Sequence, residues 1–151
     1  MYKRILVPVD GSRTSTLGLH EAIRLAQHHE SRLRLVHVVD AFIVTPAFEG
    51  GPYVKDIQKT FRADGSRILK KAEALARKRG LEVDSVMFEI VGGGAAETIV
   101  EQARKWRADL IVIGTHGRRG VSRLVMGSDA EEVARSAPVP VLLVRSKAAR
   151  R

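Results

Sequence analysis

The chain has 151 residues, 44% of them hydrophobic, which suffices for one domain with a buried core. It contains no cysteine, and this excludes disulfide frameworks, thiolate metal sites and a cysteine nucleophile. The sequence has no apolar run of about eighteen residues and no signal-peptide pattern at its start. We therefore expect a cytoplasmic protein that does not associate with a membrane.

The formal net charge is +9, a property shared with proteins that bind polyanions. Much of the excess lies in the stretch 70–79, in a basic tail over 147–151, and at Arg118, Arg119 and Arg123 of a glycine-rich loop. Charge runs are usually solvated surface, and aromatic residues make up only 5% of the chain, too few for a single-strand binder that stacks bases. We do not expect a nucleic-acid partner. A DNA affinity that falls steeply with salt, with no preference for ATP, would instead favour a polyanion-binding module.

In chain order, the first strand is predicted over 5–9, followed by turn residues at 10–12 and a helix over 15–29. A second strand is predicted over 33–39. The next segment, 40–55, contains prolines and glycines, so we predict a loop there. We expect this loop to be flexible without ligand and to close part of a ligand cleft.

A long helix is predicted from 56 to its C-cap at Gly80, then a strand over 83–91, a glycine turn at 92–94 and a helix over 96–106. The run 110–113 is apolar throughout, as expected of a central parallel strand. A glycine-bearing loop, a helix over 128–136 and a strand over 139–144 complete the pattern. Pro8 and Pro140 are placed at strand ends, because proline cannot donate to a ladder.

The loop that follows the fourth strand contains Gly114, Gly117, Gly127 and Ser128. Glycines let backbone N–H groups approach an anion, and the following helix N-terminus adds unpaired donors. Ser128 is expected to cap that helix and to reach a phosphate oxygen. The loop lacks the Walker lysine, and it does not follow the first strand as a dinucleotide fingerprint would.

With this spacing the sequence resembles the universal stress proteins, in the branch with a Gly-x2-Gly-x9-Gly-Ser/Thr nucleotide loop. The resemblance extends over nearly the whole chain, through the segments 5–12, 37–40, 109–114 and 138–144. It implies that Asp10 contacts the adenosine part and that Val38 meets the adenine largely through its backbone. It further implies that the glycine loop and Ser128 hold the ribose and the phosphates.

One departure from the family pattern is Gly93-Gly94-Ala95-Ala96-Glu97, where relatives often have Gly-x-Pro-Ala-Glu. We expect this turn to lie off the nucleotide loop, with no loss of the site. The alternative is that glycines 92–94 form a second phosphate loop, but they follow a predicted edge strand, away from the switch point.

Several polar residues allow more than one interpretation. Asp10 sits at the carboxyl end of the first strand, where it either meets a ligand or forms an Asx turn with the residues after it. His37 is expected to be a hydrogen-bonded core residue, whereas His28 and His29 are expected on the surface. At least one of Arg13, Arg118, Arg119 and Arg123 is expected to neutralise phosphates. No catalytic triad or metal-ligand pattern is present in the sequence.

We predict an α/β fold with a five-stranded, parallel, doubly wound sheet in the order 3-2-1-4-5, helices on both faces, and one Rossmann-like domain over 1–146. The expected function is that of an ATP-binding regulatory protein of the stress response, with Mg2+ as companion ion and a homodimer through the last strand. A slow ATPase or a self-phosphorylating protein, with Ser122 or Ser128 as acceptor, is the alternative. The candidate nucleotide-binding residues are Pro8, Val9, Asp10, Val38, Gly114, His116, Gly117, Arg118, Arg119, Gly127, Ser128 and Asp129.

Overall fold

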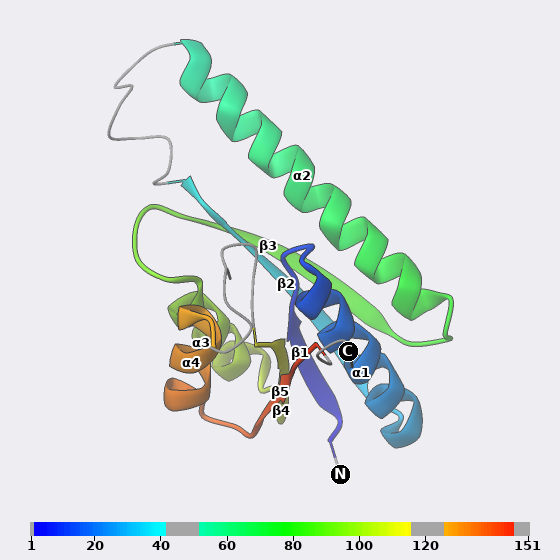
Figure 1. The fold of residues 1–151 in the computed structure, drawn as a ribbon. Coiled ribbons are helices and arrows are strands. Elements are labelled where there is room, and N and C mark those ends of the chain that lie inside the picture. Colours follow the sequence, from blue (N-terminus) through cyan, green and yellow to red (C-terminus); the bar gives the residue numbers. More distant parts are fainter. Residues whose placement is uncertain (1, 42–51, 116–125, 147–151) are drawn as a thin grey trace, which may run out of the picture.

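The computed structural model describes residues 2–41, 52–115 and 126–146, with only the backbone for 52–54 (Figure 1). Strands and helices alternate along these residues, as the sequence predicts. The strands are β1 (Arg4–Pro8), β2 (Arg32–Asp40), β3 (Val83–Ile90), β4 (Leu110–Gly114) and β5 (Val141–Val144). The helices are α1 (Arg13–His29), α2 (Pro52–Arg77), α3 (Ala95–Trp106) and α4 (Ser128–Ser136).

The five strands form one parallel sheet in the order β3-β2-β1-β4-β5, which confirms the predicted topology. Helices α1 and α2 pack on one face of the sheet and α3 and α4 on the other (Figure 1). The first half of the chain therefore adds β2 and β3 on one side of β1, and the second half adds β4 and β5 on the other side. This places the switch point of the topology between β1 and β4.

The core consists of two apolar layers separated by the sheet, and the alternation of β1 assigns its side chains to them. Ile5 and Val7 face α1 and α2, whereas Leu6 faces α3 and α4, and all three are fully buried. Every residue of β4 is buried as well. Central strands covered on both faces need such continuous apolar runs, which explains the strong signal in the sequence.

Helix α1 begins directly after the turn that follows β1. Its N-cap is Ser12, whose hydroxyl accepts a hydrogen bond of 3.2 Å from the backbone N–H of Ser15. The first turn of the helix lies against the end of β4. A Cβ on Gly114 would come within 2.6–2.8 Å of the backbone of Thr14 and Ser15, closer than real side chains approach. Glycine at this position therefore sets how closely α1 packs on the sheet.

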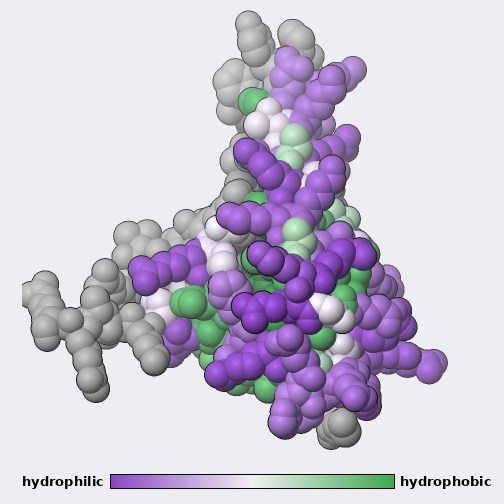
Figure 2. All heavy atoms as spheres, turned by 90° about the vertical axis from the view of Figure 1, so that its right-hand side faces the viewer, coloured by the Kyte–Doolittle hydropathy of each residue, from purple (hydrophilic) through white to green (hydrophobic). Residues whose placement is uncertain are grey.

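Helix α2 begins at Pro52, earlier than the predicted start at 56, so the last part of the predicted 40–55 loop is helical. Proline suits the first turn of a helix, where its missing N–H would have no partner. At the other end of the predicted loop Asp40 belongs to β2, and residues 42–51 of the loop lie outside the described residues, so the flexibility of the loop stays a prediction. The N-terminal part of α2 extends beyond the sheet, and its outer surface is mostly hydrophilic (Figures 1 and 2).

Strand β5 is shorter than predicted, because it begins at Val141 and not at Val139. Pro140 precedes it, and its carbonyl accepts a hydrogen bond of 3.0 Å from the N–H of Ile111. Pro8 is the last residue of β1. Both prolines thus lie at strand ends, as predicted from their missing N–H groups.

We predict that Gly114→Ala lowers the free energy of unfolding by about 1–3 kcal/mol, because α1 must move away from β4 to admit the new methyl group. Chemical denaturation of the purified variant measures this. Gly94→Ala is the control, because its Cβ would meet Asp129 Oδ1 at 3.5 Å, an ordinary contact. Its expected cost is about 0.5 kcal/mol, since alanine caps a helix less well than glycine. Equal losses in both variants would contradict the packing argument.

Candidate functional site

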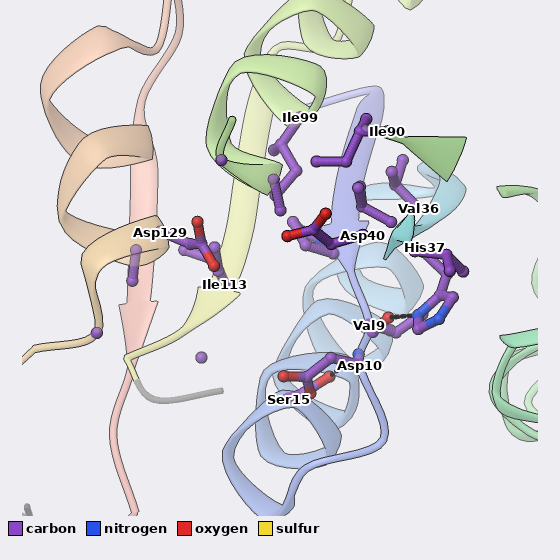
Figure 3. Close-up of a pocket in the computed structure, with 18 of the residues that line it drawn as sticks. Val9, Asp10, Ser15, Val36, His37, Asp40, Ile90, Ile99, Ile113 and Asp129 are labelled. Atoms are coloured by element: carbon purple, nitrogen blue, oxygen red, sulfur yellow. Dashed lines mark hydrogen bonds between the residues drawn. The ribbon is translucent and has the colours of Figure 1, made fainter. Parts of the chain in front are cut away.

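A cleft of about 500 Å3 opens at the carboxyl ends of the strands, at the predicted switch point (Figure 3). Its walls come from the ends of β1, β2 and β4, from the first turns of α3 and α4, and from Phe61 of α2. Cleft-lining residues that the sequence analysis proposed for nucleotide binding are Pro8, Val9, Asp10, Val38, Gly114, Gly127, Ser128 and Asp129.

One wall of the cleft is the edge of β2 beyond the end of β1. The pairing of these strands ends at Pro8 and Val36, but β2 continues to Asp40. Even-numbered residues of β2 direct their backbone groups toward β1, because Arg32 N–H donates to Lys3 and Val36 C=O accepts from Val9 N–H at 2.8 Å. The N–H and C=O of Val38 therefore point past the end of β1. Within the described residues neither has a hydrogen-bond partner on that side.

Asp10 occupies the turn between β1 and α1, and the predicted Asx turn is present. Its Oδ1 accepts a hydrogen bond of 2.9 Å from the N–H of Ser12, and its own N–H donates to Ser15 Oγ at 3.1 Å. These bonds fix the carboxylate at the floor of the cleft (Figure 3). The turn and a ligand contact are compatible, because a carboxylate can accept several hydrogen bonds.

The opposite end of the cleft is the N-terminus of α4. The N-cap is Gly127 and not Ser128, which is the first helical residue, so the predicted serine cap is wrong. Gly127 N–H donates to the carbonyl of Thr115 at 2.8 Å, which ties the start of α4 to the end of β4. No side chain caps the described start of this helix, and Ser128 and Asp129 line the cleft there. The first N–H groups of α4 therefore face the cleft without a side-chain acceptor.

The glycine turn after β3 lies at the cleft, which corrects the expectation that it is away from the site. Gly93 and Gly94 are both cleft-lining residues. Gly92 and Gly93 have φ of 73° and 83°, a conformation that favours glycine. Gly94 is the N-cap of α3 and lies beside Asp129 of α4, whose Oδ1 would be 3.5 Å from a Cβ at this position. The short β3–α3 connection, residues 91–94, thus brings its turn back toward the switch point, which the order of strands alone does not reveal.

His37 is buried, with 5% of its surface exposed, and it is hydrogen-bonded as predicted. Its Nδ1 lies 2.7 Å from the carbonyl oxygen of Val9. A carbonyl only accepts, so Nδ1 carries the proton and donates. The bond joins β2 to β1 where their ladder has ended (Figure 3). His37 therefore holds the edge of β2 beside the start of the Asp10 turn.

The carboxylates of Asp10, Asp40 and Asp129 turn toward the same space (Figure 3). Among the described residues, no group of three or more His, Cys, Asp or Glu side chains is arranged to hold a metal ion. Polar side chains on this part of the wall are thus mainly acceptors. The carboxylates of Asp10 and Asp40 suit the amino and hydroxyl groups of a ligand better than its phosphates.

Four of the candidate residues, His116, Gly117, Arg118 and Arg119, lie outside the described residues, as do Ser122 and Arg123. Arg13 begins α1 and is not one of the cleft-lining residues within the described ranges. Sequence reasoning missed Phe61 as a site residue and placed it only within the predicted long helix from 56 to 80. It also missed Asp40 as a site residue, although Asp40 is the last residue of β2, two residues after Val38.

The strand order and the cleft place the chain among the doubly wound α/β proteins, which bind ligands at the switch point. The model of the universal stress protein family matches residues 1–145. A universal stress protein of Methanocaldococcus jannaschii is 36% identical over 147 residues, covering 96% of this chain and 83% of that protein. The chain therefore belongs to the universal stress protein family.

Solved structures of relatives contain adenine nucleotides. The universal stress protein of Archaeoglobus fulgidus in complex with dAMP is 26% identical, with a TM-score of 0.70, covering 95% of this chain and 98% of that chain. Two more distant proteins share the fold. A universal stress protein in complex with cAMP is 23% identical (TM-score 0.71, covering 97% and 99%). A family member from Arabidopsis thaliana with AMP bound is 16% identical (TM-score 0.70, covering 97% and 93%).

Within the described residues, no helix combines the length and the apolar character that a membrane span requires.

We predict that His37→Phe lowers the free energy of unfolding by about 1–3 kcal/mol, because the buried carbonyl of Val9 loses its donor. His28→Phe is the control on the exposed surface of α1 and should change stability by less than about 0.5 kcal/mol. Urea denaturation of both variants at neutral pH makes the comparison. Equal losses, or no loss in either variant, would contradict the role assigned to the hydrogen bond.

Proposed function

We propose that this protein binds ATP, together with Mg2+, and acts as a nucleotide-dependent regulator in the stress response. The observation that supports this most directly is the architecture of the cleft. One end offers a backbone donor and acceptor on the edge of β2, and the other end offers the uncapped N-terminus of α4. The relative from Archaeoglobus fulgidus in complex with dAMP also supports an adenine nucleotide as the ligand.

The adenine would meet Val38. A purine ring carries hydrogen-bond donors and acceptors along one flat edge, and proteins read that edge with polar groups in the plane of the ring. The N–H and C=O of Val38 lie side by side in the plane of the sheet and point past the end of β1. Asp10, at the floor of the cleft, would accept hydrogen bonds from the ribose hydroxyls.

The phosphates would meet the N-terminus of α4. Helix N-termini attract anions through unpaired N–H groups and the positive end of the helix dipole. Gly127 has no Cβ to hinder the approach, and the hydroxyl of Ser128 is an additional donor. Asp129, in the same turn, repels phosphate, so a companion cation is useful there. Mg2+ would arrive bound to the phosphates and would neutralise the negative charge of the phosphates and of Asp129.

We expect slow turnover of ATP or none. The sequence lacks a Walker lysine, and no side chain with the context of a general base or nucleophile was identified in it. Any hydrolysis would rest on electrostatic stabilisation alone. Occupancy of the site, rather than chemistry at it, would then be the signal passed to a partner.

We predict that Gly127→Val weakens ATP binding tenfold or more, about 1.4 kcal/mol, because its side chain would occupy the approach to the α4 N-terminus. Asp10→Ala should weaken adenosine and ATP alike, since it acts at the nucleoside end. Calorimetry on protein stripped of co-purified ligand measures each dissociation constant. Circular dichroism checks that the fold is kept. Absence of binding heat for ATP, ADP, AMP and cAMP on the wild-type protein would overturn the proposed function.

We also propose a homodimer through β5. The two edges of the sheet differ in character: β3 carries Asp84 and Glu89, each paired with an arginine, whereas β5 consists of four half-buried apolar residues. Charged side chains protect an edge strand from pairing with another chain, and their absence from β5 leaves that edge open to it. A two-fold antiparallel pairing of β5 with a second copy would cover the edge.

We predict that the wild-type protein is a dimer at micromolar concentration and that Val141→Lys makes it a monomer, because a charge would be buried at the pairing edge. Light scattering on a sizing column measures both masses. Val91→Lys is the matched control beyond the end of β3, where Val91 is 74% exposed, and should leave the dimer intact. A wild-type monomer, or a dimer unaffected by Val141→Lys, would count against this interface.

A further inference from the structure

We propose that Phe61 of α2 stacks on the purine base and makes α2 a wall of the nucleotide site. This inference rests on the proposed nucleotide binding and adds a residue that selects for a planar aromatic group. Phe61 comes from a helix that packs on the sheet and not from a loop at the ends of the strands, yet it lines the same cleft as Asp10 and Val38.

The plane of the sheet determines where the base would lie. A ring bonded to the backbone of Val38 continues the sheet in the position that β1 has vacated, with one face toward the α1 and α2 layer. The side chains of His37 and Val39 project into that layer, because they alternate with Val38. Both line the cleft together with Phe61. The face of the base on this side therefore meets these three side chains.

Of these three side chains, Phe61 is the one suited to stacking. His37 is buried, and its imidazole is already bonded to Val9. Val39 is buried as well and offers no π surface. Phe61 is half-buried, so part of its ring remains accessible from the cleft. An aromatic ring beside a purine base binds it by offset stacking, an interaction that the ribose and the phosphates do not make.

A close contact one turn along the helix fixes the height of α2 above the cleft. Gly65 follows Phe61 by four residues and so lies on the same helical face. A Cβ on Gly65 would come within 2.7 Å of both His37 Cδ2 and Met87 Sδ. The backbone of α2 therefore rests directly on the side chains of β2 and β3. This position brings Phe61 to the rim of the cleft beside Val39.

A salt bridge holds the same turn of α2 to the end of β3. The guanidinium of Arg62 donates two hydrogen bonds to Glu89, of 2.5 Å from Nε and 2.8 Å from one terminal nitrogen. These hydrogen bonds lower the pKa of Glu89 below its ordinary value. Such a paired, two-point contact restricts the rotation of the helix more than a single bond does. Phe61 is thus adjacent in sequence to a residue that links α2 to β3.

The test compares Phe61→Ala with Ile57→Ala. Ile57 lies one turn earlier on α2, is 40% exposed and is not among the cleft-lining residues as described, so its variant controls for loss of an apolar side chain from this helix. Calorimetry with AMP and with adenosine on ligand-free protein gives the dissociation constants. We expect Phe61→Ala to weaken both ligands by about the same factor, on the order of tenfold, and Ile57→Ala to leave both unchanged.

A second pair of variants tests the contact without removing the ring. Phe61→Trp should retain AMP affinity, and the added indole fluorescence should be quenched when AMP binds. Ile57→Trp, which has the same background from Trp106, should show no added quenching. This arm remains informative if Phe61→Ala fails to fold.

The outcomes separate the two proposals. If the wild-type protein does not bind AMP or ATP, the proposed function fails. If it binds them but Phe61→Ala behaves like Ile57→Ala, the stacking inference is overturned and the proposed function stands. A loss for AMP with no loss for adenosine would also overturn it, because the effect would then be at the phosphate end.

Discussion

Pro8 lacks the backbone N–H that would continue the ladder from β1 to β4, and the cleft opens beside it. Even-numbered residues of β1 direct their backbone groups toward β4, since Arg4 C=O accepts from Asp109 N–H at 2.9 Å. Pairing of the two strands extends only through Leu6 and Ile111. Beyond this point β1 turns into the Asp10 segment while β2 and β4 run on. The sheet is thereby left open at its centre.

Most of the fold could be predicted because its determinants are local. The strands are short apolar runs or, in β2 and β3, alternate apolar with polar residues, and the helices have apolar stripes; the alternation of strands with helices leaves few alternatives to a parallel sheet. The misplaced start of α2 shows the limit of composition. Gly50, Gly51 and Pro52 are typical of loops, but a proline is also a favoured first residue of a helix. Proline is therefore typical both of loops and of helix starts, and only the packing of the residues after it decides between the two.

The site could be predicted only where a residue follows a strand or loop signal. Asp10 comes at a strand end and Gly127 precedes a helix, so each is marked by its place in the pattern, whereas Val38 is implied by the family resemblance. Phe61 and Gly93 are not marked in this way. Phe61 reaches the cleft because α2 is long enough to pass the end of the sheet, and Gly93 because the β3–α3 connection returns toward the centre. Both are consequences of tertiary packing across distant segments, which propensity and periodicity do not encode.

The distribution of charge complements this architecture. Residues 55–79 contain nine Lys or Arg and three Asp or Glu, so they supply six of the nine net positive charges of the chain. Three of these arginines are paired with carboxylates, at Arg62, Arg67 and Arg77, and the helix is largely solvated. A net positive field of this kind draws small anions toward the molecule at low ionic strength without choosing among them. The choice is made at short range, where the described carboxylates of the cleft repel an anion that approaches them and accept donors from a sugar or an amine. A ligand with an anionic group at one end and hydrogen-bond donors at the other fits this distribution of charge, and it fits in one orientation.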